Sequence, residues 1–171
     1  IRNNLNKGSI CSPVHITKAK NNIEVEIALQ YVDDIEENIQ SFVNVIPTPD
    51  EGTHVAGFRS GLTRIINKYA LNQEIIKEEE TFRGSDTREG LSAIIYIRMP
   101  GDQIQFESQT KTKLNNKEVR GLVRAMVEEG LGIYLEEHPR EARAIIDKIQ
   151  IGARARQAAK AAREAVLRKG A

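Results

Sequence analysis

The stretch that decides the fold class of this chain is Leu91-Ser92-Ala93-Ile94-Ile95-Tyr96-Ile97. It is nearly continuous and apolar, which is typical of a central strand that is buried on both faces of a sheet. Pro100-Gly101-Asp102 ends the run, because proline and glycine rarely continue a ladder. We therefore expect the rest of the fold to be arranged around this strand.

Shorter strand patterns precede it. Residues 13–32 carry two strand-like runs, and Ile23–Leu29 alternates apolar and polar residues, as does the run from Ile39 to Ile46. Asp33-Asp34 is typical of a turn, and Pro47–Gly52 breaks the pattern. The opening third is predicted to be an antiparallel meander, and the whole sheet to have four strands.

A helix should connect the third and fourth strands as a crossover on one face of the sheet. Thr53 is a suitable N-cap for it. Its apolar stripe has spacings of three and four: Val55, Phe58, Leu62, Ile65 and Tyr69. Residues 73–90 are expected to form a charged loop before the central strand.

Two helices should close the chain. The first is predicted from about Lys117 to Glu137, with Asn115 and Glu118 in capping-box register. Its stripe is Val119, Leu122, Met126 and Leu131. The order of strands and helices gives the class α+β.

The last helix begins at Pro139, a residue favoured in a first turn, and extends to about Lys169, with its continuity through Gly152 left open. Only its first half has apolar positions that can pack a core: Ala142, Ile145, Ile146 and Ile149. The second half would project about 25 Å at 1.5 Å per residue. We expect one domain, with residues 1–138 as the α+β core and 139–171 as a basic helix.

Composition narrows the class of protein. The chain has 171 residues, 40% of them hydrophobic and 29% charged, with a net charge of +1, which fits a folded domain and excludes a uniformly basic nucleic-acid binder. No apolar run approaches the roughly 20 residues that span a bilayer. The single cysteine, Cys11, excludes an intrachain disulfide and a cysteine zinc cage, so we expect a reducing, cytoplasmic location.

Motifs of a complete enzyme are missing. His15, His54 and His138 are scattered without metal-ligand spacing, and each fits a surface or capping role better than a ligand role. There is no nucleophile elbow and no Walker-type phosphate loop. The ends of the chain, from Ile1–Asn4 to Arg168–Ala171, suggest a fragment of a longer protein.

One segment carries candidate chemistry: Phe106-Glu107-Ser108-Gln109-Thr110-Lys111-Thr112-Lys113-Leu114. Gln109 and Lys111 stand two apart in a stretch expected to be extended, so their side chains would point the same way. An amide and an ammonium together suit one terminal phosphate. A polar connector is the simpler interpretation, and the spacing by itself favours it.

Basic residues gather at the end of the chain. From Lys148 onward there are seven basic residues against one acid, Glu164, while the rest of the chain is net acidic. This tail could track a phosphate backbone, or be the solvated side of a helix that packs on another subunit, and residue chemistry slightly favours the second. Arg59, Arg64, Arg83 and Arg88 form a second basic surface if the fold brings them together.

Four motifs, in order, cover nearly the whole chain: Gly52-Thr53-His54-Val55-Ala56-Gly57-Phe58-Arg59, Arg88-Glu89-Gly90-Leu91, the Phe106–Leu114 block and Ala153-Arg154-Ala155-Arg156. In this the chain resembles the transducer domain of bacterial type IIA DNA topoisomerases, as found in the ATPase subunits of gyrase and topoisomerase IV. The Gln-Thr-Lys block is the specific part. The Ala-Arg-Ala-Arg helix alone would be weak.

The resemblance implies a ribosomal protein S five domain 2-like fold and a place after an ATPase domain that binds ATP and Mg²⁺. It implies that Gln109 and Lys111 contact the γ-phosphate of ATP, and that Arg59, with Arg64 as a further candidate, faces DNA in a central cavity. Implied partners are that ATPase domain, a second copy through the ATPase gate, DNA, and a gyrase A-type cleavage subunit in a heterotetramer of two copies each. The long helix from Pro139 would lead toward the DNA-cleavage core.

The ATPase residues themselves are absent from this sequence, so we expect the fragment alone to be inactive, with no catalytic residue and no metal ligand of its own. Two alternatives stay open. One is a stand-alone nucleic-acid-binding module, and the other is the equivalent domain of a mismatch-repair or chaperone ATPase. The sequence does not separate gyrase from topoisomerase IV.

Overall fold

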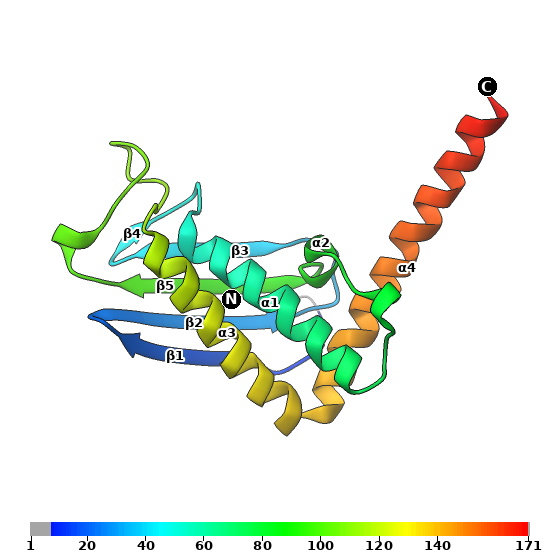
Figure 1. Cartoon of the computed structure of the whole chain (residues 1–171), viewed down its shortest axis with the longest axis horizontal. Helices are drawn as coiled ribbons and strands as arrows, with labels where there is room; N and C mark the ends of the chain where they lie inside the picture. Colours follow the sequence, from blue (N-terminus) through cyan, green and yellow to red (C-terminus); the bar gives the residue numbers. More distant parts are fainter. Residues whose placement is uncertain (1–7, 171) are drawn as a thin grey trace.

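The computed structural model describes residues 8–170, so Ile1–Asn4 lie outside the described part (Figure 1). Five strands form one sheet in the order β1-β2-β5-β3-β4. Their bounds are β1 Val14–Lys20, β2 Ile23–Tyr31, β3 Asn38–Val43, β4 Ile46–Pro47 and β5 Leu91–Arg98. The predicted α+β class is confirmed.

The order of the strands differs from a meander. β1 and β2 form an antiparallel hairpin, and β2 pairs antiparallel with β5, but β3 lies parallel to β5 on its other side. The predicted meander is therefore wrong beyond β2, because the crossover between β3 and β5 makes these two strands parallel neighbours. The predicted count of four strands is also wrong, since Ile46–Pro47 pairs with Phe42–Val43 at the sheet edge, where proline is tolerated.

β5 is the central strand, as predicted, but it is buried on one face only. Leu91, Ala93, Ile95 and Ile97 are buried, whereas Ser92, Ile94 and Tyr96 are half-buried. The expectation of burial on both faces is wrong because both covering helices lie on the same side of the sheet (Figure 1). On the open face the rings of Phe42 and Tyr96 stack with centroids 6.0 Å apart and shield part of the apolar surface.

Helices α1, Thr53–Asn72, and α3, Lys117–Glu137, cover the sheet side by side, and the bounds of α3 agree with the prediction. Close packing depends on Gly57, where an added Cβ would lie 2.4 Å from the carbonyl oxygen of Arg120. The buried stripe of α1 includes Ile66 and Ala70, while Ile65 and Tyr69 are only partly buried. The N-cap predictions miss by one residue, because Gly52 precedes α1 and Asn116 precedes α3.

The expected loop over residues 73–90 contains short helical turns. A 3-10 turn covers Glu78–Glu80, and the four-residue helix α2 covers Gly84–Thr87. A further 3-10 turn, Gly101–Gln103, follows β5. Two polar residues of α2, Asp86 and Thr87, are buried, so this segment belongs to the packed structure.

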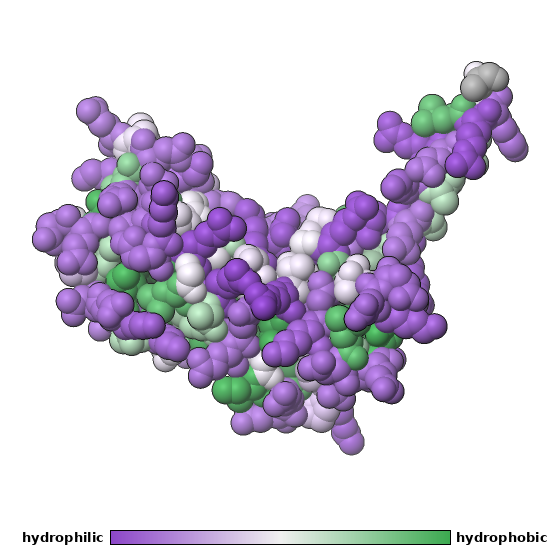
Figure 2. Space-filling model, viewed as in Figure 1, coloured by the Kyte–Doolittle hydropathy of each residue, from purple (hydrophilic) through white to green (hydrophobic). Residues whose placement is uncertain are grey.

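The last helix, α4, runs from Pro139 to Lys169 and continues through Gly152. Ala142, Ile145, Ile146 and Ile149 are buried, together with Ala153. Beyond Arg156 every described residue of the helix is exposed, and this end leaves the body of the molecule as a free rod (Figure 1). Its surface is mostly hydrophilic, with an apolar group near the far end, where Val166 and Leu167 are exposed (Figure 2). Across the described residues, none of the helices is both long enough and apolar enough to cross a membrane.

Candidate functional site

The loop from Phe106 to Leu114 is fixed at its base. Leu114 donates its N–H to the carbonyl of Glu51, and its own carbonyl accepts the N–H of Thr53. The N–H of Asp50 donates to the carbonyl of Thr112 at 3.0 Å. The base of the loop is thus bound by backbone hydrogen bonds to the segment that enters α1.

A buried asparagine fixes the segment after the loop. The Asn116 side chain is fully buried, accepts the N–H of Gln105 and donates to the carbonyl of Gln103 and to Glu118. The predicted capping box of Asn115 with Glu118 is therefore wrong, because Asn116 makes this contact through its side-chain amide. Asn116 positions the loop against the start of α3.

The tip of the loop carries Gln109 and Lys111. It folds as a turn in which the N–H of Lys111 donates to the carbonyl of Ser108, and Lys111 has a left-handed φ of 55°. The expectation of an extended stretch here is wrong, because the turn reverses the chain between the two side chains. Hydroxyl groups of Ser108, Thr110 and Thr112 are hydrogen-bonded in a row along the same turn.

The two lysines of the loop differ in their surroundings. The Lys113 ammonium lies 2.7 Å from the Glu107 carboxylate, and that hydrogen bond raises the pKa of Lys113. Within residues 8–170, neither the Lys111 ammonium nor the Gln109 side-chain amide has such a partner, and both residues are exposed. Lys111 therefore retains a charge and donors that are available to an anion.

Arg59 lies between two acidic side chains. Its guanidinium donates two hydrogen bonds to Glu51, at 2.6 and 2.9 Å, and two more to Glu37, at 3.1 and 2.8 Å. Partial burial by itself would lower the pKa of Arg59, but these hydrogen bonds raise it. The charge of Arg59 is thus offset within the fold, which sequence spacing could not indicate.

The sequence pointed to three further arginines near Arg59: Arg64, Arg83 and Arg88. Only Arg88 shares an acidic partner with Arg59, because its Nε lies 3.1 Å from the second oxygen of Glu37. Arg64 lies on another side of α1 and pairs with Glu128 of α3 at 3.2 Å. Arg83 precedes α2 and is exposed. The fold therefore gathers Arg59 and Arg88 around the carboxylate of Glu37, and it does not bring all four arginines together as one surface.

A second ion pair joins α2 to α4. Arg156 makes two parallel hydrogen bonds to Asp86, at 2.8 and 2.9 Å, and Asp86 also accepts the N–H of Arg83. Asp86 is only 1% exposed. Burial tends to raise its pKa, but the hydrogen bonds from Arg156 and Arg83 lower it overall. Arg156 was seen in the sequence only as part of a basic tail, and its partner lies 70 positions away.

None of the three histidines belongs to a metal-binding cluster among the described residues. His54 is fully buried, its Nε2 is 3.0 Å from the Thr48 hydroxyl, and burial lowers its pKa to about 4. His15 pairs with Glu26, and His138 stacks on Tyr134 between α3 and α4. No cluster of three or more metal-binding side chains occurs among the described residues.

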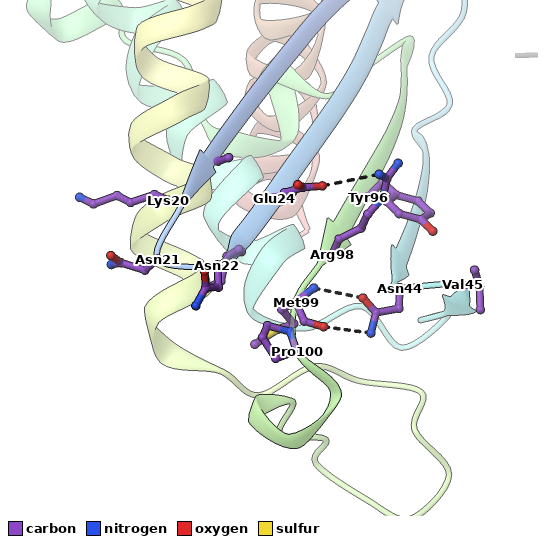
Figure 3. A pocket seen from close by; sticks show the side chains of 12 residues that line it. Lys20, Asn21, Asn22, Glu24, Asn44, Val45, Tyr96, Arg98, Met99 and Pro100 are labelled. Atoms are coloured by element: carbon purple, nitrogen blue, oxygen red, sulfur yellow. Dashed lines mark hydrogen bonds and ion pairs between the residues drawn. The ribbon is translucent and has the colours of Figure 1, made fainter.

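An open pocket of about 810 Å³ lies at the end of the sheet where β1 turns into β2 (Figure 3). Several of its polar side chains are already paired: Asn44 makes two hydrogen bonds to the backbone of Met99, and Arg98 pairs with Glu24. Arg98 also lies over the Tyr96 ring. Because these groups bind one another, the pocket offers less to a ligand than the loop tip does.

Taken together, the geometry presents an exposed cation and amide on a loop with a fixed base, at the end of the molecule away from the α4 rod (Figure 1). Comparison with known proteins now decides the family. The family model described as DNA gyrase B matches residues 2–165. The chain belongs to the DNA gyrase B family.

Relatives within this family are DNA gyrase B subunits of several bacteria. The chain is 45% identical to that of Chitinophaga japonensis over 98% of its length, and 47% identical to that of Halalkalibacterium halodurans over 94%. It spans 35% and 25% of the length of these two proteins. It therefore corresponds to about a quarter to a third of a gyrase B subunit.

Solved structures agree. The 43K ATPase domain of Thermus thermophilus gyrase B, in complex with an aminocoumarin, matches 95% of the chain with a TM-score of 0.86 and 34% identity, over 44% of that protein. The topoisomerase IV ATP-binding domain of Francisella tularensis, in complex with a small-molecule inhibitor, matches 84% of the chain with a TM-score of 0.76 and 30% identity, over 39% of that protein. The fold seen here is thus part of the ATPase region of both.

Proposed function

We propose that this chain is the transducer region of an ATP-dependent type II DNA topoisomerase of the gyrase B kind, which couples ATP hydrolysis to DNA strand passage and supercoiling. The observation that carries the proposal is the loop tip, where Lys111 and Gln109 are exposed and unpaired within residues 8–170, above a base fixed to α1. The family membership and the match to two ATPase-region structures support it.

In this proposal the loop completes the ATP site of a preceding ATPase domain. Lys111 would supply a positive charge and Gln109 a side-chain amide to the terminal phosphate of ATP, which itself supplies the bond that is hydrolysed. The residues present fit a phosphate but not Mg²⁺, because no metal-binding cluster occurs among the described residues. The Mg²⁺ ligands and the catalytic residues would belong to the ATPase domain, and the fragment alone would be inactive.

The remaining expectations concern the two parts of the chain, its protein partners and DNA. Residues 1–138 would be the α+β core, and α4 from Pro139 would lead toward the cleavage core, with a gyrase A-type subunit as partner and a second copy joined through the ATPase gate. Arg59 and Arg64 would face DNA. Arg64 would contribute more, because its side chain is 63% exposed, whereas Arg59 is 31% exposed and bound to two carboxylates.

The test uses a whole gyrase B-type subunit that contains this region. Lys111→Ala should reduce ATP turnover by about 100-fold, the effect typical of removing one donor from a desolvated transition-state site. The matched control is Lys113→Ala, in the same loop, because Lys113 is paired with Glu107 and should leave turnover within about 2-fold. Equal turnover in wild type and Lys111→Ala would reduce the loop to a connector.

A salt titration separates the proposal from a stand-alone nucleic-acid-binding module. A module that neutralises several phosphates should bind duplex DNA with a steep salt dependence as an isolated chain. The isolated transducer should bind duplex DNA feebly at every salt concentration, because its net charge is only +1 and Arg59, Arg88 and Arg156 are engaged by acidic side chains. Tight, salt-sensitive binding by the 171-residue chain would favour the module.

A further inference from the structure

The ion pairs described above are connected to one another. Glu51 binds Arg59, Arg59 binds Glu37, and Glu37 binds Arg88 with its other oxygen. Arg88 is the C-cap residue of α2. Within the same short helix Asp86 binds Arg156 of α4. An unbroken series of ion pairs and one helical turn thus runs from the segment before α1 to α4.

These pairs are also the least exposed ones. In each of the four, neither side chain is more than 35% exposed. In every other ion pair found among residues 8–170, at least one side chain is 39% exposed or more. Since burial reduces screening by water and salt, the connected pairs are the ones that hold a fixed geometry.

Glu51, the first residue of the series, also binds the base of the loop. The backbone carbonyl of Glu51 accepts the N–H of Leu114, while its side chain binds Arg59. Glu51 has a left-handed φ of 67°, an uncommon conformation for a non-glycine residue. Its neighbour Gly52 has a φ of 134°, and an added Cβ there would meet the Leu114 carbonyl oxygen at 2.3 Å.

The last member is placed where α4 leaves the core. Ala153 is the last buried residue of the helix, and Arg156 follows it by three positions, on the side that meets α2. The contacts of α2 with α4 and with α1 place this short helix between the two long ones. Its Asp86 therefore binds α4 at the point where the helix leaves the core.

We propose that Glu51, Arg59, Glu37, Arg88, Asp86 and Arg156 form one ion-pair relay that couples the base of the Gln109–Lys111 loop to α4. Glu51 and Asp86 are positioning residues in it, because they act through the loop and the helix that they hold. The use of this coupling as a nucleotide signal rests on the proposed function. The coupling itself is a property of the 171-residue chain without nucleotide.

Amide hydrogen exchange of the 171-residue chain tests the relay from one end. Arg156→Gln removes the charge that holds Asp86, and it should raise exchange at the amides of Asp50, Thr53 and Leu114 by about 5-fold or more relative to amides at the centre of β2 and β5. The reference amides report global unfolding, so a general loss of stability does not count as coupling. The matched control is Arg143→Gln, which breaks an exposed pair with Asp147 on the same helix.

The reverse experiment starts from the loop. Glu51→Asn keeps a residue that tolerates a left-handed φ but is too short to reach Arg59, and it should raise exchange by about 5-fold at the α4 amides around Arg156. Arg156→Lys, which keeps the charge and loses the two-bond fork, should give a smaller change than Arg156→Gln. The unfolding constant of the Glu51→Asn, Arg156→Gln double variant should depart from the product of the single effects by about 3-fold.

The relay would be overturned if amide exchange at the end opposite the substitution rises no more than it does in β2 and β5. It would also be overturned if exchange rises equally in Arg143→Gln. This outcome is separate from the fate of the proposed function. ATP turnover that is unchanged by Lys111→Ala, with exchange coupling intact, would leave the relay standing and remove its role in nucleotide sensing. Loss of turnover in Lys111→Ala without exchange coupling would support the proposed function and overturn the relay.

Discussion

Helices α1 and α4 each contain arginines and an internal glycine that lies against another part of the chain, yet they are held differently. α1 is packed along its length, from His54 and Phe58 to Ile66 and Ala70, all buried. α4 is packed only as far as Ala153, and every residue from Gln157 to Gly170 is exposed. Arg59 of α1 lies between acids from two loops, and Arg156 of α4 binds one buried carboxylate.

The two glycines show what the difference means. A Cβ on Gly57 of α1 would lie 2.4 Å from a backbone oxygen of α3, and a Cβ on Gly152 of α4 would lie 2.3 Å from the carboxylate oxygen of Glu89. The distances are nearly equal, but a backbone oxygen within a helix cannot move away, whereas the end of a glutamate side chain can. The cost of adding a Cβ therefore depends on whether the atom that it meets can move, and not only on the distance between the two atoms.

The largest effect is expected in α1. Gly57→Ala should lower the free energy of unfolding by about 3 kcal/mol, because the clash with α3 outweighs the roughly 1 kcal/mol that alanine contributes to a helix interior. Urea unfolding of the 171-residue chain measures it. The control is Gly121→Ala in α3, which has no atom within 4 Å of the added Cβ and should be neutral or stabilising. Similar results for both variants would contradict the close α1–α3 packing.

The second effect concerns pH and the buried start of α1. The pKa of His54 is lowered to about 4, so the folded chain keeps it neutral while the unfolded chain binds a proton below about 6.5. The unfolded state therefore binds more protons between these values, and stability should fall by about 3 kcal/mol as pH drops from 6.5 to 4. His54→Gln should remove this part of the slope. A slope that persists unchanged in the variant would assign it to other groups.

A smaller effect is expected for the glycine of α4. Gly152→Ala should change the free energy of unfolding by no more than about 1 kcal/mol, because the strain of moving Glu89 is offset by the better helix propensity of alanine. The double variant with Glu89→Ala should be more stable than Glu89→Ala alone. Thermal unfolding of the four proteins gives the comparison, and a loss as large as that of Gly57→Ala would show that Glu89 is fixed.

The smallest effect belongs to the exposed half of α4. Val166→Ala should change the unfolding free energy by less than about 0.5 kcal/mol, because Val166 is 71% exposed. Ile149→Ala, in the packed half, should cost about 2–5 kcal/mol and serves as the reference. Denaturant unfolding of both variants measures the contrast. A large loss for Val166→Ala would mean that this half of the helix is covered in solution.

Local patterns predicted the helices well. The bounds Lys117–Glu137 and Pro139–Lys169 follow from apolar spacing and from proline at a first turn, both of which are local. The sheet was predicted less well, because the pairing of β3 with β5 is set by the crossover rather than by either strand's own residues. The half-burial of Ile94 and Tyr96 likewise depends on which face the helices cover.

The candidate loop was found from the sequence, but its surroundings were not. Gln109 and Lys111 stand in one short block, whereas the acids that bind Arg59 lie 22 and 8 positions before it. The partner of Asp86 lies 70 positions away, in a segment whose composition indicates only a basic tail. Ion-pair partners that lie so far apart in the sequence are determined by the tertiary structure, so no local sequence pattern predicts them.

The free half of α4 has a mechanical consequence. From Arg156, which binds Asp86, to Lys169 a straight helix forms a lever arm of about 20 Å at 1.5 Å per residue. A rotation of about 10° at Arg156 displaces the end of the helix by about 3.5 Å, roughly two-thirds of the rise of one helical turn. A rearrangement of side chains too small to alter the core is thereby converted into a displacement of several ångströms at the end of α4.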